Sequence, residues 1–128
     1  MSFFKSFFGN DEKPSEASKV QWNYLTEIDQ LSTLEEESKE QPVVIFKHST
    51  RCIISRTALK QFENQFDLHE KVKPYFLDLL EYRPISNEIA VRFNVMHQSP
   101  QMIVLKDGFS VYDASHDAID AEDLKKFV

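Results

Sequence analysis

The stretch PVVIFKHSTRCIISR, residues 42–56, decides the fold that we predict for this chain. Most of its first seven residues are β-branched or aromatic, which is typical of a strand that is covered on both faces. A short polar loop, residues 49–51, follows, and a helical pattern of apolar residues begins beyond it. We therefore predict that residues 42–48 form the central strand of a sheet and that the loop carries Cys52 to the start of a helix.

Helical periodicity appears on both sides of this strand. Before it, apolar residues recur every three positions between polar neighbours, which predicts a surface helix over residues 27–40. After it, Leu59, Phe62 and Phe66 share one face of a helix that follows Cys52. The central strand therefore lies between two helices in the sequence.

The second half of the chain continues the alternation. Residues 73–82 read as a strand, and Ser86 is a suitable N-cap for a short helix that Asn94 terminates in a left-handed conformation. Residues 100–115 hold two apolar runs joined by Lys106-Asp107-Gly108, a strong hairpin signal. Asp120 can cap a closing helix, which has acidic residues early and lysines late, in the order that the helix dipole favours.

These elements define the fold class. A first strand near Trp22 completes an order in which three strands alternate with helices and the last two strands form an antiparallel hairpin. We predict an α/β protein of thioredoxin-like fold, with a mixed central sheet and helices on both faces. Residues 20–128 form this domain, and residues 1–19 are an aromatic head and polar linker that we expect to be partly flexible.

Composition excludes several classes of function. A chain of 128 residues has the length of one domain, and a net charge of −6 argues against nucleic-acid binding. One cysteine permits no internal disulfide, and it supplies only one thiolate ligand for a zinc site within one chain. We therefore expect no metal. We recognise neither a signal peptide nor a membrane span, and a reducing, cytoplasmic location is the simplest expectation.

Cys52 is the candidate for chemistry. At the first turn of a helix, unpaired backbone N–H groups and the positive end of the helix dipole stabilise a thiolate, the form of cysteine that attacks disulfides. We predict that Arg51 and Lys47 add stabilising positive charge, and that His48 contributes less, and only if it is protonated. A lone cysteine is most often a small buried hydrophobic residue, but a strand-to-helix turn favours an accessible one.

Ser55 stands where a second cysteine would complete a dithiol motif. Residues three apart share a helix face, so its hydroxyl group can donate a hydrogen bond to the sulfur. An alcohol is too weakly acidic to displace a thiol, so it cannot resolve a mixed disulfide formed at Cys52. The motif therefore permits one-thiol chemistry and excludes two-thiol chemistry within the chain.

A second element precedes the strand that starts near Gln101. Pro100 cannot extend a helix and marks a strand entry. A cis Ser99–Pro100 bond would turn the backbone of Ser99 toward the cysteine loop, where it could pair with an extended substrate, whereas a trans proline would merely begin the strand. We predict substrate binding by Thr50, Arg51, Ser99 and Pro100.

Several segments together resemble one family. The segments IFKHSTRCIISR, YFLDLLEYRPISNEIAVRFNV and HQSPQMIVLKDG, followed by YDASH, are similar to the YtxJ-like family of monothiol bacilliredoxins over roughly residues 20–128. The resemblance implies a thioredoxin fold and an enzyme whose cysteine removes bacillithiol from mixed disulfides on proteins. Cys52 would be the attacking sulfur and Ser55 the non-resolving partner, and Ile53 stands where family members commonly have proline.

The resemblance also implies the partners of the reaction. Bacillithiolated proteins would be the substrates, bacillithiol or a similar low-molecular-weight thiol a co-substrate, and no cofactor would stay bound. A second thiol or a partner redoxin must regenerate the cysteine. Two alternatives remain, a non-catalytic thioredoxin-fold module that binds proteins and an iron–sulfur carrier in which two chains each supply one cysteine. Ile53-Ile54 does not match the glycine and phenylalanine of monothiol glutaredoxins that carry clusters.

Overall fold

The computed structural model describes residues 20–128. The predicted head and linker, residues 1–19, lie outside this range. The elements in chain order are β1 Asn23–Tyr24, α2 Gln30–Glu37, β2 Val43–His48, α3 Ile53–Gln65, β3 Lys73–Asp78, α4 Arg83–Arg92, β4 Gln101–Lys106, β5 Phe109–Ser115, and the 3₁₀ segments η1 His116–Ala118 and η2 Ala121–Phe127.

The strands form one mixed sheet in the order β1-β3-β2-β4-β5. β1, β3 and β2 run parallel, whereas β4 is antiparallel to β2 and β5 is antiparallel to β4. β2 has a partner on each side, and all six of its residues are buried. The prediction that this run forms the centre of the sheet is confirmed.

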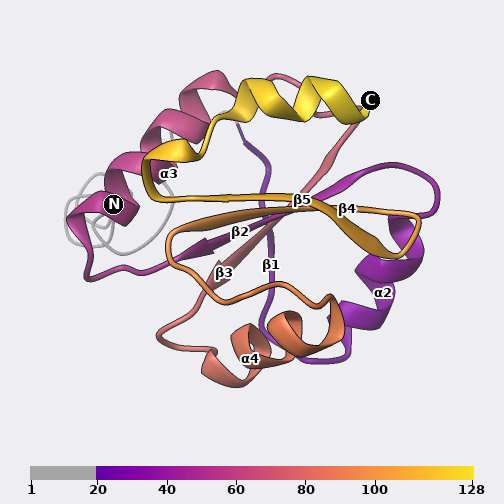
Figure 1. Ribbon diagram of the computed structural model, residues 1–128, viewed down its shortest axis with the longest axis horizontal. Coiled ribbons are helices and arrows are strands. Elements are labelled where there is room, and N and C mark those ends of the chain that lie inside the picture. The colour runs from indigo at the N-terminus through magenta and orange to yellow at the C-terminus, as the bar shows by residue number, and fades with distance from the viewer. Residues whose placement is uncertain (1–19) are drawn as a thin grey trace, which may run out of the picture.

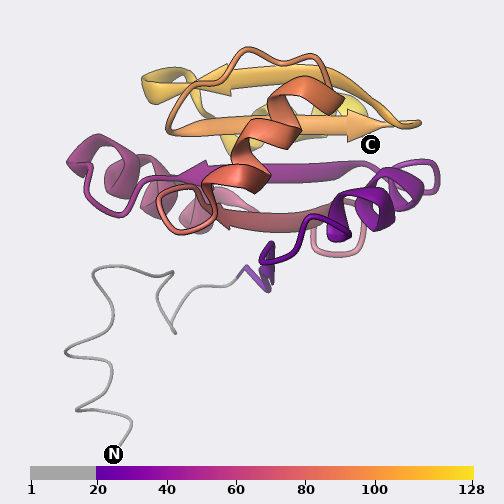
Figure 2. The same ribbon diagram turned by 90° about the horizontal axis from the view of Figure 1, so that it is seen from below.

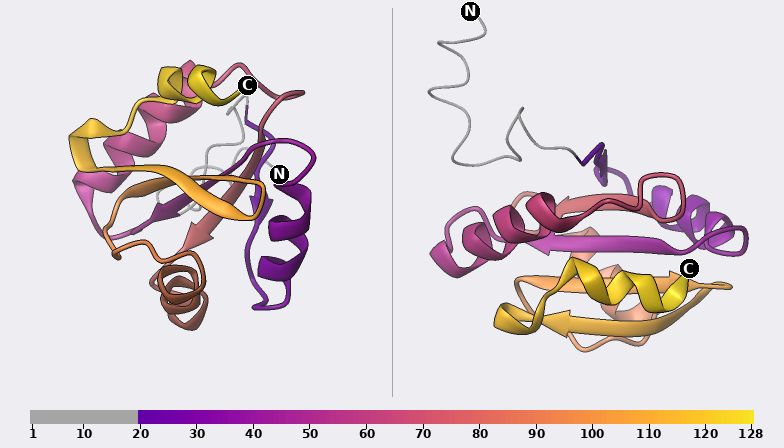
Figure 3. Two further views of the ribbon diagram at one scale, coloured as in Figure 1. Left: turned by 45° about the vertical axis from the view of Figure 1, so that its right-hand side comes forward. Right: turned by 90° about the horizontal axis from the view of Figure 1, so that it is seen from above.

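Two hydrophobic clusters fill the two faces of the sheet. Alternate residues of a strand point to opposite faces, so Val44 and Phe46 join the cluster under α3, and Val43 and Ile45 join the cluster under α2 and α4. Figure 1 shows α3 and the C-terminal 3₁₀ segment on one side of the sheet and α2 and α4 on the other. In Figure 3 the C-terminal segment lies over the same face as α3. The predicted arrangement of helices on both faces is confirmed.

Capping and turn residues account for the ends of several elements. Asn94 has φ 55°, and Asp107 and Gly108 have φ 56° and 86°, as expected of a left-handed helix terminator and of a tight hairpin turn. The Asp120 side chain accepts a hydrogen bond from the Glu122 backbone N–H at 2.9 Å, so its predicted role as a cap is confirmed. The segment that it caps is a 3₁₀ rather than an α-helix.

Two predicted boundaries are wrong. β3 ends at Asp78 instead of residue 82, because the Asp78 carboxylate accepts hydrogen bonds from the backbone N–H groups of Leu80 and Glu81 and turns the chain. α4 begins at Arg83, with a proline in its first turn, so Ser86 is not its N-cap. The Ser86 side chain is fully buried instead.

The sheet topology brings distant segments to one edge. Figure 2 shows the arrowheads of β2 and β3 at the same end of the sheet, while β4 points the other way. Because Lys47 pairs with Gln101, the chain leaving β2 toward Cys52 and the chain entering β4 from Ser99–Pro100 share that edge. Among residues 20–128, none of the helices combines the length and apolar character needed to cross a membrane.

Candidate active site

Cys52 is the N-cap residue of α3. Its backbone has an extended conformation, with φ −110° and ψ 124°, and its carbonyl group accepts the Arg56 N–H at 3.0 Å to close the first turn. The Cys52 N–H donates to the Ser49 carbonyl at 3.2 Å, which shapes the loop ahead of the helix. The cysteine is partly exposed. The structure therefore places the only thiol where the first turn of a 13-residue helix presents its N–H groups.

Apolar side chains are exposed at this helix start and in the loop that leads to Ser99–Pro100. Ile53 and Ile54 are 70 % and 57 % exposed, although isoleucine is normally a core residue. Met96, in the loop that leads to Ser99–Pro100, is 80 % exposed. The predicted loop residues differ in exposure, since Arg51 is exposed and Thr50 is partly buried. The edge of the sheet that carries Cys52 therefore exposes three apolar side chains and the positive charge of Arg51.

Ser55 points into the protein. Its side chain is fully buried, its Oγ lies 2.7 Å from Nδ1 of His48, and it accepts the Ser49 backbone N–H at 3.0 Å. The hydroxyl group therefore has His48 and Ser49 as partners rather than the predicted partner, the sulfur of Cys52. Ser55 holds the start of α3 against the end of β2, and so it positions the turn that carries the cysteine.

His48 is a buried, neutral partner of this serine. Burial lowers the pKa of His48 to about 4, while the Asp78 charge acts in the opposite direction and that of Arg56 adds to the lowering. The ring also lies against Phe76, with the centroids 5.6 Å apart. At neutral pH His48 is uncharged, so the contribution that we considered for a protonated His48 is not made.

Lys47 lies on the other face of the sheet from α3. Its side chain follows Ile45 toward α4, and Nζ is 2.8 Å from Nδ1 of His97. Burial lowers the pKa of Lys47 to about 8, and the pKa of His97 is lowered by burial and then by the charges of Lys47 and Arg83. Neutral His97 can thus accept the Lys47 hydrogen bond. This geometry argues against the predicted role of Lys47 in stabilising a thiolate.

Alkylation rates distinguish the two predicted cations. We expect Arg51→Gln to slow the reaction of Cys52 with iodoacetamide at pH 7 by about two- to threefold, because an exposed charge next to the thiolate is partly screened by solvent. Lys47→Met should leave the rate unchanged. Circular dichroism would check that both variants are folded. Equal slowing in the two variants would show that Lys47 does stabilise the Cys52 thiolate.

Ser99 and Pro100 are joined by a cis peptide bond. The Pro100 carbonyl accepts the His116 backbone N–H at 3.1 Å, and the Gln101 side-chain amide donates to the Met96 carbonyl at 3.0 Å. Ser99 Oγ is buried, with no hydrogen-bond partner within residues 20–128. The loop that carries the cis bond is therefore fixed by β4 and by the chain after β5, at the edge of the sheet that Cys52 shares.

Sequence reasoning did not find the supporting residues of the site. Ser86 Oγ lies 3.4 Å from His97 Nδ1 beside Lys47, and Gln101 holds the loop before β4. Lys47 and His48 were singled out only for their charge, without the partners His97 and Ser55 that the structure gives them. Within the described residues, no three side chains of histidine, cysteine, aspartate or glutamate converge where they could hold a metal ion.

The fold and this site define a class of protein: a thioredoxin-fold protein with a single cysteine at the start of the helix after its central strand. A solved structure whose description gives it a thioredoxin fold and proposes an oxidoreductase activity is 33 % identical, with TM-score 0.70, over 80 % of this chain and 89 % of that one. Thioredoxins of Malassezia sympodialis and Schistosoma mansoni, 18 % and 24 % identical, share the fold with TM-scores of 0.64 and 0.62. The matches cover 86 % and 82 % of this chain and 90 % and 96 % of those chains.

The family model "Monothiol bacilliredoxin BrxC" matches residues 23–124. The chain belongs to this family of thioredoxin-fold redox proteins. The match includes Cys52, Ser55 and the Ser99–Pro100 loop.

Proposed function

We propose that this protein is a monothiol disulfide oxidoreductase that removes bacillithiol, or a similar low-molecular-weight thiol, from mixed disulfides on proteins. The observation that carries the proposal is the contrast between Cys52, partly exposed at the N-cap of α3, and Ser55, fully buried three residues later. One sulfur is accessible, and the position that would hold a resolving sulfur is a hydroxyl group turned away from solvent. The family match supports the same reading.

The proposed reaction begins with thiol–disulfide exchange. The Cys52 thiolate attacks the bacillithiol sulfur of the mixed disulfide, a new S–S bond forms, and the S–S bond to the protein breaks. The electron pair of the broken bond leaves on the protein sulfur, which then takes up a proton. The substrate protein recovers its thiol, and bacillithiol stays on Cys52. The N–H groups at the start of α3 stabilise the attacking thiolate before the exchange.

The second half of the cycle needs another molecule. Ser55 cannot displace bacillithiol from Cys52, because an alcohol is a far weaker acid and leaving group than a thiol. A second bacillithiol thiolate attacks the bacillithiol sulfur of the adduct, forms bacillithiol disulfide and frees the Cys52 thiolate. Over the whole cycle one disulfide, that of the substrate protein, is consumed, and one disulfide, that of bacillithiol, is formed, so no other reductant is needed. A partner redoxin could take the same place.

Substrate docking would use the surface around the cysteine. The backbone of Ser99, before the cis bond to Pro100, would pair with an extended segment of the substrate protein, while Thr50 and Arg51 contact it from the other side. The exposed side chains of Ile53 and Ile54 would cover the apolar part of the same segment. Such contacts would account for the two isoleucines that are exposed next to the thiol.

Mass spectrometry of a single turnover tests the proposed reaction. Equimolar reduced protein and a bacillithiolated model protein should yield one bacillithiol adduct, located on Cys52, together with the free thiol of the model protein. The adduct should persist until bacillithiol is added, because the chain has no second cysteine. A Cys52→Ala variant that releases bacillithiol at the wild-type rate would contradict the proposal and favour the non-catalytic binding module.

A further inference from the structure

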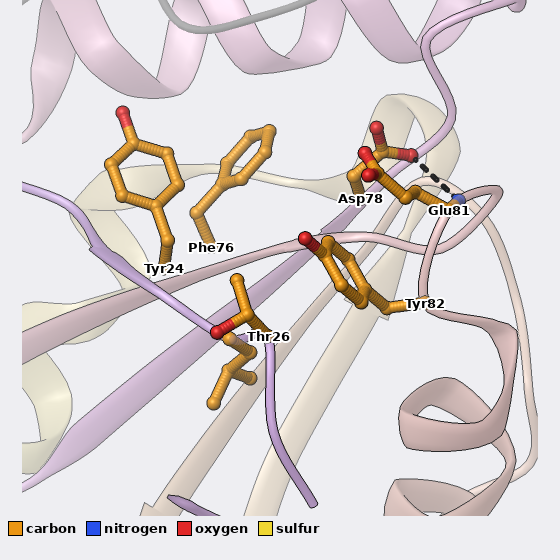
Figure 4. Close-up of a pocket in the computed structure, with 7 residues that line it drawn as sticks. Tyr24, Thr26, Phe76, Asp78, Glu81 and Tyr82 are labelled. Carbon is orange, nitrogen blue, oxygen red and sulfur yellow. Dashed lines mark hydrogen bonds between the residues drawn. The ribbon is translucent and has the colours of Figure 1, made fainter.

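A second feature of the active-site edge is a cavity at the carboxyl ends of β1 and β3. Its volume is about 430 Å³, and Tyr24, Phe76, Tyr82, Asp78 and Glu81 are among the residues that line it. Figure 4 shows the rings of Tyr24 and Phe76 on one side of the cavity and the carboxyl groups of Asp78 and Glu81 on the other. We call this cavity the strand-end pocket. Parallel strands commonly present ligand sites at this end.

The strand-end pocket is linked to the turn that carries Cys52 through His48, the last residue of β2. The Leu79 N–H donates to the His48 carbonyl at 3.0 Å, and His48 pairs with Asp78 in the sheet. The His48 ring contacts Phe76 of the pocket on one side and Ser55 of α3 on the other. A group in the pocket would therefore lie one strand away from the chain that leads to the reactive sulfur.

The charge of the pocket is negative. Asp78 is held in place by the N–H groups of Leu80 and Glu81, which fixes one carboxylate at the wall, and Glu81 adds an exposed second one. An adjoining cavity shares Tyr82 and Glu81 and adds two further carboxylates, those of Glu27 and Asp29. No lysine or arginine of the described residues lines either cavity.

The aromatic walls favour the same sign of ligand charge. The faces of tyrosine and phenylalanine rings attract cations, and Tyr24 is 50 % exposed. The pKa of Tyr82 is raised, first by burial and then by the charges of Glu81, Asp78 and Glu27. A long side chain with a cationic end and an apolar stem would satisfy both the carboxylates and the rings.

We propose that the strand-end pocket binds an arginine or lysine side chain of the substrate protein, close in sequence to the cysteine that carries the mixed disulfide. This inference rests on the proposed function, since it concerns how the same reaction selects its protein substrates. The net charge of −6 favours cationic partners in the same way. The cationic side chain anchors the substrate at β1 and β3 while its disulfide meets Cys52 after β2.

Matched peptides test the charge preference. Each peptide carries one cysteine in a mixed disulfide with the same small thiol, and pairs differ only by arginine or its uncharged isostere citrulline, placed one to four residues on either side. At the best position, we expect kcat/KM to be about fivefold higher for arginine, chiefly through KM, and the ratio to fall at high salt. Glu81→Gln should lower the ratio to below about two.

Glu40→Gln is the matched control. It removes the same charge from an exposed residue that precedes β2, at the opposite edge of the sheet, and should keep the wild-type preference. Equal kcat/KM for arginine and citrulline at every position, or a preference that Glu81→Gln leaves unchanged, would overturn the proposal.

A binding measurement separates failure of the pocket from failure of the catalytic function. Arginine peptides without a disulfide, titrated into the Cys52→Ser variant, should shift the NMR signals of the Tyr24 and Tyr82 rings more than citrulline peptides do. Such shifts without thiol release from any peptide would support the pocket and contradict the oxidoreductase. Thiol release without dependence on peptide charge would support the oxidoreductase and overturn the pocket.

Discussion

Replacing Cys52 by serine is expected to reduce the rate at which a low-molecular-weight thiol is removed from a protein mixed disulfide by at least about a hundredfold, because a serine hydroxyl group stays protonated in neutral water. The substitution changes one atom at a partly exposed N-cap, and serine is itself a favourable N-cap residue. The fold should therefore persist. Mass spectrometry of the alkylated model protein, which separates its mixed-disulfide form from its free-thiol form, measures the effect.

Ser55→Ala is the comparison for this variant. Because Ser55 contacts His48 and Ser49, its loss should lower stability while leaving thiol release within several-fold of the wild type. A Cys52→Ser variant that retains more than about a tenth of the wild-type rate would show that Cys52 is not the attacking nucleophile. A Ser55→Ala variant as inactive as Cys52→Ser, but fully folded, would show that the hydroxyl group takes part in the reaction.

The stability of the protein should depend on pH through His48. The pKa of this histidine is about 4 in the folded protein and near 6.5 when unfolded, so the unfolded chain binds more protons between these values. The contribution of neutral His48 to the free energy of unfolding is therefore fully present above pH 6.5, and it decreases as the pH drops toward 4. We expect His48 alone to account for about 2 to 3 kcal/mol of the free energy of unfolding lost between pH 7 and 4.5.

Urea unfolding of His48→Asn at both pH values measures this contribution. Asparagine keeps a polar group beside Ser55 but does not titrate, so the loss of stability on acidification should be smaller by the expected amount. Other titrating groups contribute equally in both proteins and cancel from the difference. His116→Asn is the control, because His116 is exposed and asparagine tolerates its positive φ of 56°. An unchanged pH dependence in His48→Asn would show that the buried ring is not the cause.

Local patterns along the chain determined the order of its elements. The apolar run at 43–48, the helical spacing of Leu59 and Phe62, and the turn at Asp107-Gly108 each act within a few residues, so they can be read without knowing the fold. The ends of elements were predicted less well. β3 stops at Asp78 because a side chain bonds to the backbone two and three residues later, and apolar residues beyond it gave no sign of this.

The sequence also singled out the cysteine but not its surroundings. Cys52 follows a strand and begins a helix, and both facts are local. The partners of Ser55 and Lys47 depend on the alternation of side chains across the sheet, which sends His48 to the α3 face and Lys47 to the α4 face. His97 is fifty residues from Lys47 in sequence, and no local pattern connects the two.

The sequence by itself thus determined the fold class and the position of its single cysteine at the start of a helix, because periodicity, turns and the count of cysteines are properties of neighbouring residues or of composition. Only the tertiary structure decided that Ser55 pairs with His48, that Lys47 faces away from α3, and that two tyrosines and two carboxylates meet beside the active edge. These juxtapositions arise when parallel strands from distant parts of the chain align their carboxyl ends. Burial then sets the charge of His48, because removing a ring from water disfavours its protonated form.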